Sequence, residues 1–170
     1  MSRLLAGLAA LCLWSGAPQA ATLTVKAGAD AQERLQTALL DAKPGDVVAI
    51  GPGRFELTDG LSLDVDGVTV RGAGQGRTVL SFAGQQGAGE GLLITSDRVT
   101  VRDLSVQNTK GDGIKSKGSD QISFLNLTVE WTGGPKESNG AYGVYPVTST
   151  NVLIDRVTVR GASDAGIYVG

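Results

Sequence analysis

Three segments of the chain share one spacing of apolar residues. Counted from the first apolar position of each segment, the others follow at offsets 2, 5 and 7, and the segments begin 23 and 30 residues apart. Alternation with a period of two is typical of a β-strand that buries one face. The residues that carry this pattern are Val99, Val101, Leu104 and Val106; Ile122, Phe124, Leu127 and Val129; and Val152, Ile154, Val157 and Val159.

A bend interrupts each segment at the same place. The step from offset 2 to offset 5 breaks the period of two, so each segment predicts two short strands that meet at a corner, at residues 102–103, 125–126 and 155–156. A further short strand opens with Gly91, Gly113, Gly143 and Gly166, which are 22, 30 and 23 residues apart. Three short strands per turn, each pairing with its equivalent about 4.8 Å away in the next turn, predict an all-β fold, the right-handed parallel β-helix.

The turns of this coil depend on one another for stability. Roughly six inward apolar side chains contribute about 1.5–3 kcal/mol each, whereas ordering the backbone costs about 1–2 kcal/mol for each residue of a turn. One turn alone is therefore not expected to fold. The 30-residue step indicates an insertion of about seven residues near Thr132 to Asn139, which we expect to leave the coil as a loop.

A short helix is predicted before the repeats. Asp30, with Glu33 three residues later, predicts a capping box that opens a helix reaching about Ala42. Its apolar side consists of Leu35, Leu39 and Leu40. We expect this helix to cover the first turn, because an uncovered strand edge invites addition of another strand. Residues 21–45 then form an N-terminal strand and capping helix, and 46–170 form the turns, which we expect to continue beyond residue 170 because Gly166 opens a new one.

The first 20 residues predict a signal peptide. Arg3 precedes an apolar run from Leu4 to Trp14, and small residues follow up to Ala20 and Ala21, after either of which cleavage fits. The run of about eleven residues is too short to span a membrane. A bulky Leu11 before Cys12 argues against a lipoprotein. We therefore expect a periplasmic or secreted protein without a membrane span.

Composition narrows the available chemistry. The chain has 15 Lys and Arg, 17 Asp and Glu, no His and a single Cys, Cys12, which the predicted cleavage removes. The remaining part has no group for a disulfide, a thiol nucleophile or a His-ligated metal. A negative net charge argues against nucleic acid as a partner. We expect a monomer.

The sequence resembles a known family. The stretch from Pro44 to Phe55, the Gly-x-Gly of Gly72 and Gly74 after a Val-rich strand, and the later Thr78-Val79-Leu80 are similar to the N-terminal turns of pectin-lyase-like right-handed β-helix proteins. That superfamily includes polysaccharide lyases, glycoside hydrolases, uronate epimerases and exported proteins without an assigned activity. The segments 139–146 and 162–168 are similar to those of a bacterial subgroup of periplasmic β-helix proteins. The resemblance implies the fold, and no catalytic residue carries over from it.

Two motifs have structural explanations that we prefer. Gly72, Gly74 and Gly76 lack the following helix of a nucleotide-binding loop, so they predict a tight corner. Asn126 lies in a glycosylation sequon, but its corner position predicts a bond to the backbone or a ladder with its neighbours.

The outward positions suggest a binding face. Two residues beyond the repeated glycines stand Leu93, Lys115, Tyr145 and Tyr168, and four beyond them stand Thr95, Lys117 and Val147. We also place Tyr142 and Trp131 near this face, on or beside the inserted loop. Aromatic rings stack on the C–H faces of sugars and lysines attract carboxylates, which together suit an acidic polysaccharide. The competing interpretation is an aromatic stack that only stabilises the sheet.

Two kinds of chemistry follow if the ligand is a polyuronate. In a lyase or epimerase a Lys or Tyr removes the proton α to the carboxylate, and Lys115 is the candidate catalytic base, with Lys117, Tyr142, Tyr145, Tyr168 and Trp131 as substrate contacts. The carboxylates Asp112, Glu137 and Asp164 could hold Ca²⁺, the one cofactor that the sequence suggests, although solvated turn residues explain them as well. The alternative function is a non-catalytic envelope scaffold that binds a protein partner.

Overall fold

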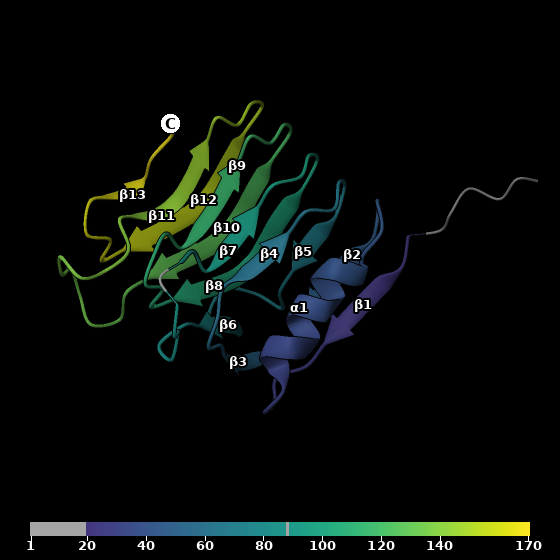
Figure 1. Ribbon diagram of the computed structural model, residues 1–170, viewed down its shortest axis with the longest axis horizontal. Helices are drawn as coiled ribbons and strands as arrows, with labels where there is room; N and C mark the ends of the chain where they lie inside the picture. Colours follow the sequence, from purple (N-terminus) through teal and green to yellow (C-terminus); the bar gives the residue numbers. More distant parts are fainter. Residues whose placement is uncertain (1–19, 88) are drawn as a thin grey trace, which may run out of the picture.

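The computed structural model describes residues 20–87 and 89–170, so the predicted leader up to residue 19, with Cys12, lies outside the described part. The chain forms a parallel β-helix that runs from the helix α1 at one end to the last strands at the other (Figure 1). None of the helices in the described part is long and apolar enough to cross a membrane. The elements are β1 Thr22–Val25, α1 Ala31–Asp41, β2 Val47–Ile50, β3 Gly53–Glu56, β4 Leu61–Leu63, β5 Thr69–Arg71, β6 Thr78–Ser81, β7 Leu92–Ile94, β8 Thr100–Gln107, β9 Ile114–Lys117, β10 Ser123–Glu130, β11 Tyr142–Val147, β12 Leu153–Arg160 and β13 Ala165–Ile167.

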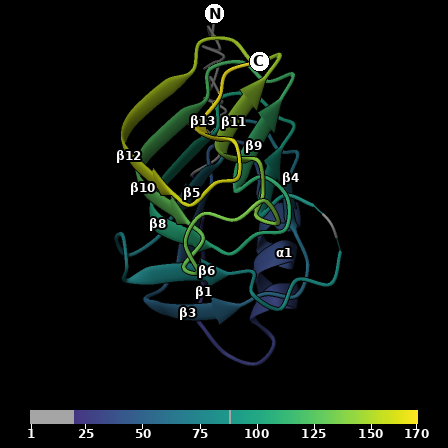
Figure 2. The same ribbon diagram turned by 90° about the vertical axis from the view of Figure 1, so that its left-hand side faces the viewer.

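Two parallel sheets form the walls of the coil. The eight-stranded sheet has the order β1-β2-β5-β8-β10-β12, with β3 and β6 joined to it through β8, and the five-stranded sheet has the order β4-β7-β9-β11-β13. The view in Figure 2, turned by 90°, shows the two walls on opposite sides of the coil. Pairing of each strand with its equivalent in the next turn confirms the predicted β-helix.

The predicted apolar columns are confirmed by the strand register. Leu92 pairs with Ile114, which pairs with Val144, which pairs with Ile167. In the other sheet Val101, Phe124 and Ile154 form one column. All of these side chains except those of the last turn are fully buried; Ile167 keeps 43% of its surface exposed because no described strand packs beyond β13.

The predicted corners are also present. Asp103, Asn126 and Arg156, the second residues of the three bends, have φ of 59°, 54° and 51°, a left-handed conformation that turns the strand without ending it. The Asn126 amide donates to Asp103 Oδ1 over 2.7 Å and its oxygen accepts from Gln75 Nε2 over 2.9 Å. Asn126 is therefore part of the ladder that its corner position predicts.

The repeated glycines are explained by close packing between turns. Gly91, Gly113 and Gly143 do not have positive φ, so they are not needed for an unusual backbone conformation. A Cβ on Gly91 would lie 2.6 Å from the carbonyl oxygen of Gly113, and one on Gly113 would lie 2.6 Å from that of Gly143. Each glycine thus lets the next turn stack at a distance that a side chain would prevent.

Helix α1 covers the first turn, as predicted, but two details of the prediction are wrong. It packs on β1, β2, β3 and β4 with Leu35 and Leu39 buried, whereas Leu40 is 56% exposed because it follows Leu39 by one residue and turns outward. Asp30 makes no capping bond, since its carboxylate pairs with Arg34 over 2.9 Å.

The open edge of β4 is covered by side-chain amides from α1. Gln36 Nε2 donates to the Ser62 carbonyl over 3.0 Å and its oxygen accepts from the Ser62 N–H over 2.9 Å. One glutamine therefore takes the place of the missing neighbouring strand.

The inserted segment forms a loop between β10 and β11, as expected. Asn139 ties it down by donating to the carbonyls of Gly134 and Gly161 over 2.9 and 2.6 Å. Trp131, at the start of the loop, is 5% exposed, and its indole N–H donates to the Thr109 carbonyl over 2.7 Å. Trp131 thus lies at the inserted loop, as expected, but its expected role as a substrate contact is wrong because the ring is buried.

Candidate functional site

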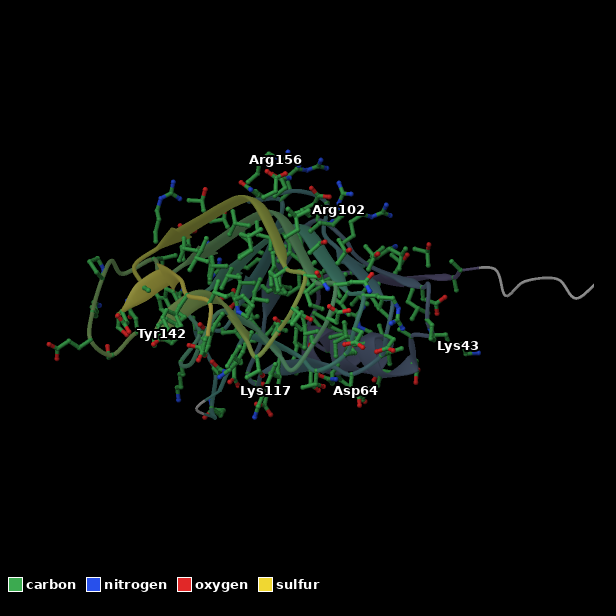
Figure 3. All side chains as sticks on the ribbon, turned by 90° about the horizontal axis from the view of Figure 1, so that it is seen from above. Lys43, Asp64, Arg102, Lys117, Tyr142 and Arg156 are labelled. Atoms are coloured by element: carbon green, nitrogen blue, oxygen red, sulfur yellow. The ribbon has the colours of Figure 1, made fainter. Side chains whose placement is uncertain are left out.

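The outward column predicted from the glycine spacing is formed by the five-stranded sheet. Leu93 pairs with Lys115, which pairs with Tyr145, and Lys117 pairs with Val147. We call the outward residues Leu93, Lys115, Lys117, Tyr142, Tyr145 and Tyr168 the lysine–tyrosine face. In Figure 3 Lys117 lies on the opposite side of the molecule from Arg102 and Arg156, which mark the corners of the other sheet.

The three tyrosines pack against one another. The ring of Tyr142 lies 4.7 Å from that of Tyr145 and 4.8 Å from that of Tyr168, and the rings of Tyr142 and Tyr168 are nearly parallel, with an interplanar angle of 16°. The centroids of Tyr145 and Tyr168 are 5.5 Å apart. Tyr142 and Tyr145 are half-buried, while Tyr168 is 45% exposed. Tyr168 therefore offers the most accessible ring of the cluster.

Lys115 lies between two carboxylates and a ring. Its Nζ is 2.9 Å from Glu90 Oε1, 3.2 Å from Asp112 Oδ2 and 5.0 Å from the centre of the Tyr145 ring. Burial alone would lower the pKa of Lys115, but the hydrogen bonds to Glu90 and Asp112 outweigh it and raise the pKa above its ordinary value. Lys115 is therefore an ammonium at neutral pH, which does not suit the predicted role of a general base.

Lys117 differs from Lys115 in its surroundings. Its side chain is exposed, and within residues 20–87 and 89–170 no carboxylate oxygen lies within 4.0 Å of its amine. Its amine makes no ion pair there and remains open to a ligand, whereas the amine of Lys115 is paired with Glu90 and Asp112. Lys117 is still near enough to Glu90 to help lower the pKa of that carboxyl.

The three carboxylates predicted to hold Ca²⁺ do not meet. No group of three or more His, Cys, Asp or Glu side chains in the described part of the chain has an arrangement that could hold a metal ion. Asp112 binds Lys115, and Glu137 is exposed on the inserted loop. A hydrogen bond to Asp164, together with burial, raises the pKa of Tyr142. The expectation of one shared cation site is therefore wrong, because each carboxylate has a separate position.

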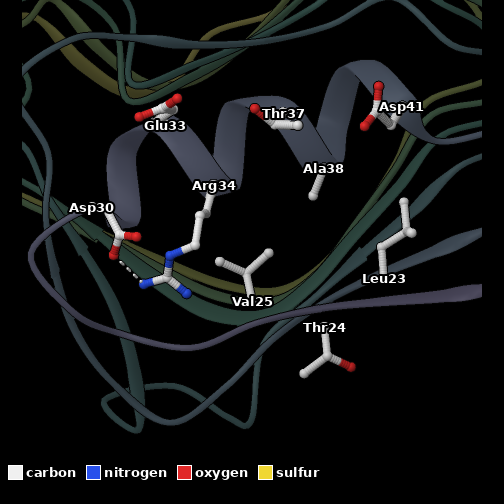
Figure 4. A pocket seen from close by; sticks show the side chains of 9 residues that line it. All are labelled: Leu23, Thr24, Val25, Asp30, Glu33, Arg34, Thr37, Ala38 and Asp41. Atoms are coloured by element: carbon white, nitrogen blue, oxygen red, sulfur yellow. Dashed lines mark ion pairs between the residues drawn. The ribbon is translucent and has the colours of Figure 1, made fainter.

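Two hollows lie towards the α1 end of the coil. A shallow one of about 220 Å³ lies beside Glu90, Ser62 and Leu93 and continues the lysine–tyrosine face towards α1. An open groove of about 520 Å³ runs between α1 and β1, where Leu23 and Val25 point towards the helix (Figure 4). Only the first adjoins the candidate face.

Two solved structures are similar in fold to this chain. An alginate lyase from Paenibacillus sp. str. FPU-7 superimposes with a TM-score of 0.65 at 23% sequence identity, over 88% of this chain and 50% of that one. This likeness agrees with the parallel β-helix fold of the chain. A pectin methylesterase mutant in complex with a hexasaccharide gives a TM-score of 0.49 at 12% identity, over 82% of this chain and 50% of that one.

These likenesses concern the fold, and the chain spans half the length of either structure. No protein-family model matches the sequence, and no curated protein matches it significantly.

Sequence reasoning missed Glu90. This residue lies in the irregular connection between β6 and β7, where neither apolar alternation nor a constant spacing places a side chain. Its only signal is its position next to Gly91, the first of the repeated glycines.

Proposed function

We propose that this protein is an exported member of the pectin-lyase-like superfamily that binds an acidic polysaccharide on its lysine–tyrosine face. The observation that carries the proposal is the exposed Tyr168 ring, supported by two further tyrosines and placed directly after β13 of the sheet that carries Lys117, whose exposed amine makes no ion pair among the described residues. A sugar ring would stack on the tyrosine through its C–H face, while a uronate carboxylate would approach the lysine. The periplasm or the cell exterior is the proposed location.

Binding fits the geometry better than proton abstraction does. A lyase or epimerase needs a base that is deprotonated near neutral pH. The pKa values of both Lys115 and Tyr142 are raised, so each side chain keeps its proton. A lyase or epimerase acting on uronates is therefore the second candidate, and it would be recognised by ultraviolet-absorbing unsaturated products when the protein is mixed with polyuronate.

Calorimetric titration tests the binding proposal. Alginate oligomers are the first ligand, because an alginate lyase shares the fold, and neutral oligosaccharides of equal length are the comparison. Lys117→Gln should weaken alginate binding about 1.4- to 5-fold at low salt and hardly at high salt, since an exposed ionic contact contributes roughly 0.2–1 kcal/mol and is screened. Lys43→Gln, at the end of the molecule away from Tyr142 in Figure 3, is the matched control and should bind as the wild type does.

Tyr168→Ala separates stacking from charge. Its loss should weaken binding about 2- to 12-fold at every salt concentration, if a ring–sugar contact contributes the roughly 0.5–1.5 kcal/mol of a stacked aromatic pair. Equal heats for the wild type, Lys117→Gln and Tyr168→Ala would contradict the placement of the site. An absence of heat with every oligosaccharide would favour the alternative, a scaffold that binds a protein partner.

In this proposal Lys115, which lies over the Tyr145 ring, does not contact the ligand but holds Glu90 and Asp112 in place. Lys115→Gln leaves Glu90 and Asp112 without their shared cation, so we expect a loss of stability of about 1–3 kcal/mol. The salt dependence of alginate binding should remain that of the wild type, because the ligand contacts Lys117 instead. A reduced salt dependence in Lys115→Gln would show that the ligand contacts Lys115 directly.

A further inference from the structure

The junction between the predicted leader and the fold is held by one buried carboxylate. Asp46, 6% exposed, accepts the N–H of Ala21 at Oδ1 over 2.7 Å and the N–H of Lys43 at Oδ2 over 2.9 Å. The Ala21 carbonyl in turn accepts the N–H of Val47 over 2.9 Å, which begins the pairing of β1 with β2. Ala20, the residue before, is exposed. Within the described residues, the first of these hydrogen bonds is made by Ala21.

The two cleavage positions that the sequence allows have different consequences at Asp46. Cleavage after Ala20 converts the Ala21 nitrogen, already 2.7 Å from Asp46 Oδ1, into an α-ammonium group. Cleavage after Ala21 would remove both the donor to Asp46 and the acceptor of the Val47 N–H. A hydrogen bond between ionised partners is roughly twice as strong as one between neutral groups, so cleavage after Ala20 strengthens one interaction, whereas cleavage after Ala21 removes two.

We propose that a signal peptidase cuts the chain between Ala20 and Ala21 and that Asp46 then holds the new α-ammonium group of Ala21 as an ion pair. This inference rests on the export that is part of the proposed function. In the hydrolysis, water adds to the Ala20 carbonyl carbon and the C–N bond breaks. Ala20 leaves with the new carboxylate, and the Ala21 amine takes up a proton at neutral pH.

The ion pair has a defined pH dependence. A free α-amino group has a pKa of about 7.7–8.0, and a carboxylate partner raises it. The stabilisation is therefore fully present below about pH 7.7 and is lost as the pH rises through the raised pKa. The backbone N–H groups of Ala21 and Lys43 hold the pKa of Asp46 below its ordinary value, so the carboxylate stays ionised over this range. The side chain of Lys43 is the other charged group that acts on Asp46.

Export of the full chain in a bacterial host, followed by intact-mass measurement and N-terminal sequencing, tests the cleavage position. The expected first residue is Ala21. A chain that begins at Thr22 or elsewhere would overturn this inference and leave export standing. A chain that keeps its first 20 residues would count against export itself.

A second measurement tests the ion pair on the processed chain. The thermal midpoint of the form that begins with a free Ala21 amine is compared with that of the same form acetylated at Ala21, which keeps the N–H but has no charge. We expect the free amine to melt about 2–4 °C higher at pH 6.5, with no difference at pH 10 and none in Asp46→Asn at either pH. Equal midpoints of the free and acetylated forms at pH 6.5 would overturn the pairing.

Discussion

Replacing Gly113 by alanine should cost much more stability than its small size suggests. The added Cβ would overlap Cγ1 of Val129 and lie 2.6 Å from the carbonyl oxygen of Gly143. Neither neighbour moves easily, because Val129 is buried and the Gly113 N–H is bonded to the next turn at the Tyr142 carbonyl over 2.8 Å. Overpacking of this kind costs about 1–3 kcal/mol, and we expect the upper part of that range because one obstacle is backbone.

Gly89→Ala is the matched control for this variant. A Cβ on Gly89 has no atom within 4 Å among the described residues. We expect this variant to be neutral or stabilised by up to about 1 kcal/mol, because alanine reduces the entropy of the unfolded chain. Urea unfolding followed by circular dichroism measures both changes. Similar free energies of unfolding for the two variants would refute the argument that the repeated glycines exist for close stacking.

Two further predictions concern the core and the connection between β9 and β10. Phe124→Ala should lower the free energy of unfolding by about 3–5 kcal/mol, since Phe124 is fully buried between paired neighbours. Leu153→Ala is the control, and because Leu153 is 53% exposed it should change the free energy of unfolding by no more than about 0.5 kcal/mol. A loss below about 1 kcal/mol for Phe124→Ala in urea unfolding would contradict its burial. Hydrogen bonds from Thr150, Asn151 and Gln121 lower the pKa of Asp120 to about 2, so its contribution to stability is present above the unfolded value near 3.8 and is lost as the pH falls towards 2. The thermal midpoint of the wild type should therefore fall more steeply than that of Asp120→Asn between pH 5 and pH 2, and parallel curves would speak against this role.

The fold could be predicted from the sequence because a β-helix repeats its own constraints. Each inward position recurs in several successive turns, so the assignment of an apolar residue such as Phe124 to the core is supported by Val101 one turn before it and Ile154 one turn after it. The corners repeat in the same way. A single side chain without a repeated equivalent has no such support, as two residues of α1 and its start show. The capping pattern predicted a backbone bond for Asp30, which forms an ion pair with Arg34 instead. Helical periodicity predicted a buried Leu40, which points outward and is exposed.

The chemistry of the candidate face was harder to predict, because it depends on residues outside the repeat. Register places Lys115 and Lys117 on one outward face, and sequence alone treats them as equal charges. Glu90, in the connection before β7, reaches Lys115 from the preceding turn, and Asp112 lies three residues before Lys115 in the same turn, so Lys115 is ion-paired and Lys117 is not. Spacing cannot show this, since a loop of irregular length fixes the position of Glu90.

The unequal lysines limit how strongly charge can contribute to binding. If Lys117 alone attracts a carboxylate, the affinity for a polyuronate should decrease with salt as a single exposed contact does, and the remaining affinity should come from the tyrosine rings. Tyr168 is the accessible ring, while Tyr142 and Tyr145 hold it in place from the neighbouring strand. Neutral oligosaccharides should then bind the same face more weakly than acidic ones, and the difference in binding free energy should not exceed the contribution of Lys117. The preference for acidic over neutral oligosaccharides is therefore expected to be modest and to disappear in Lys117→Gln.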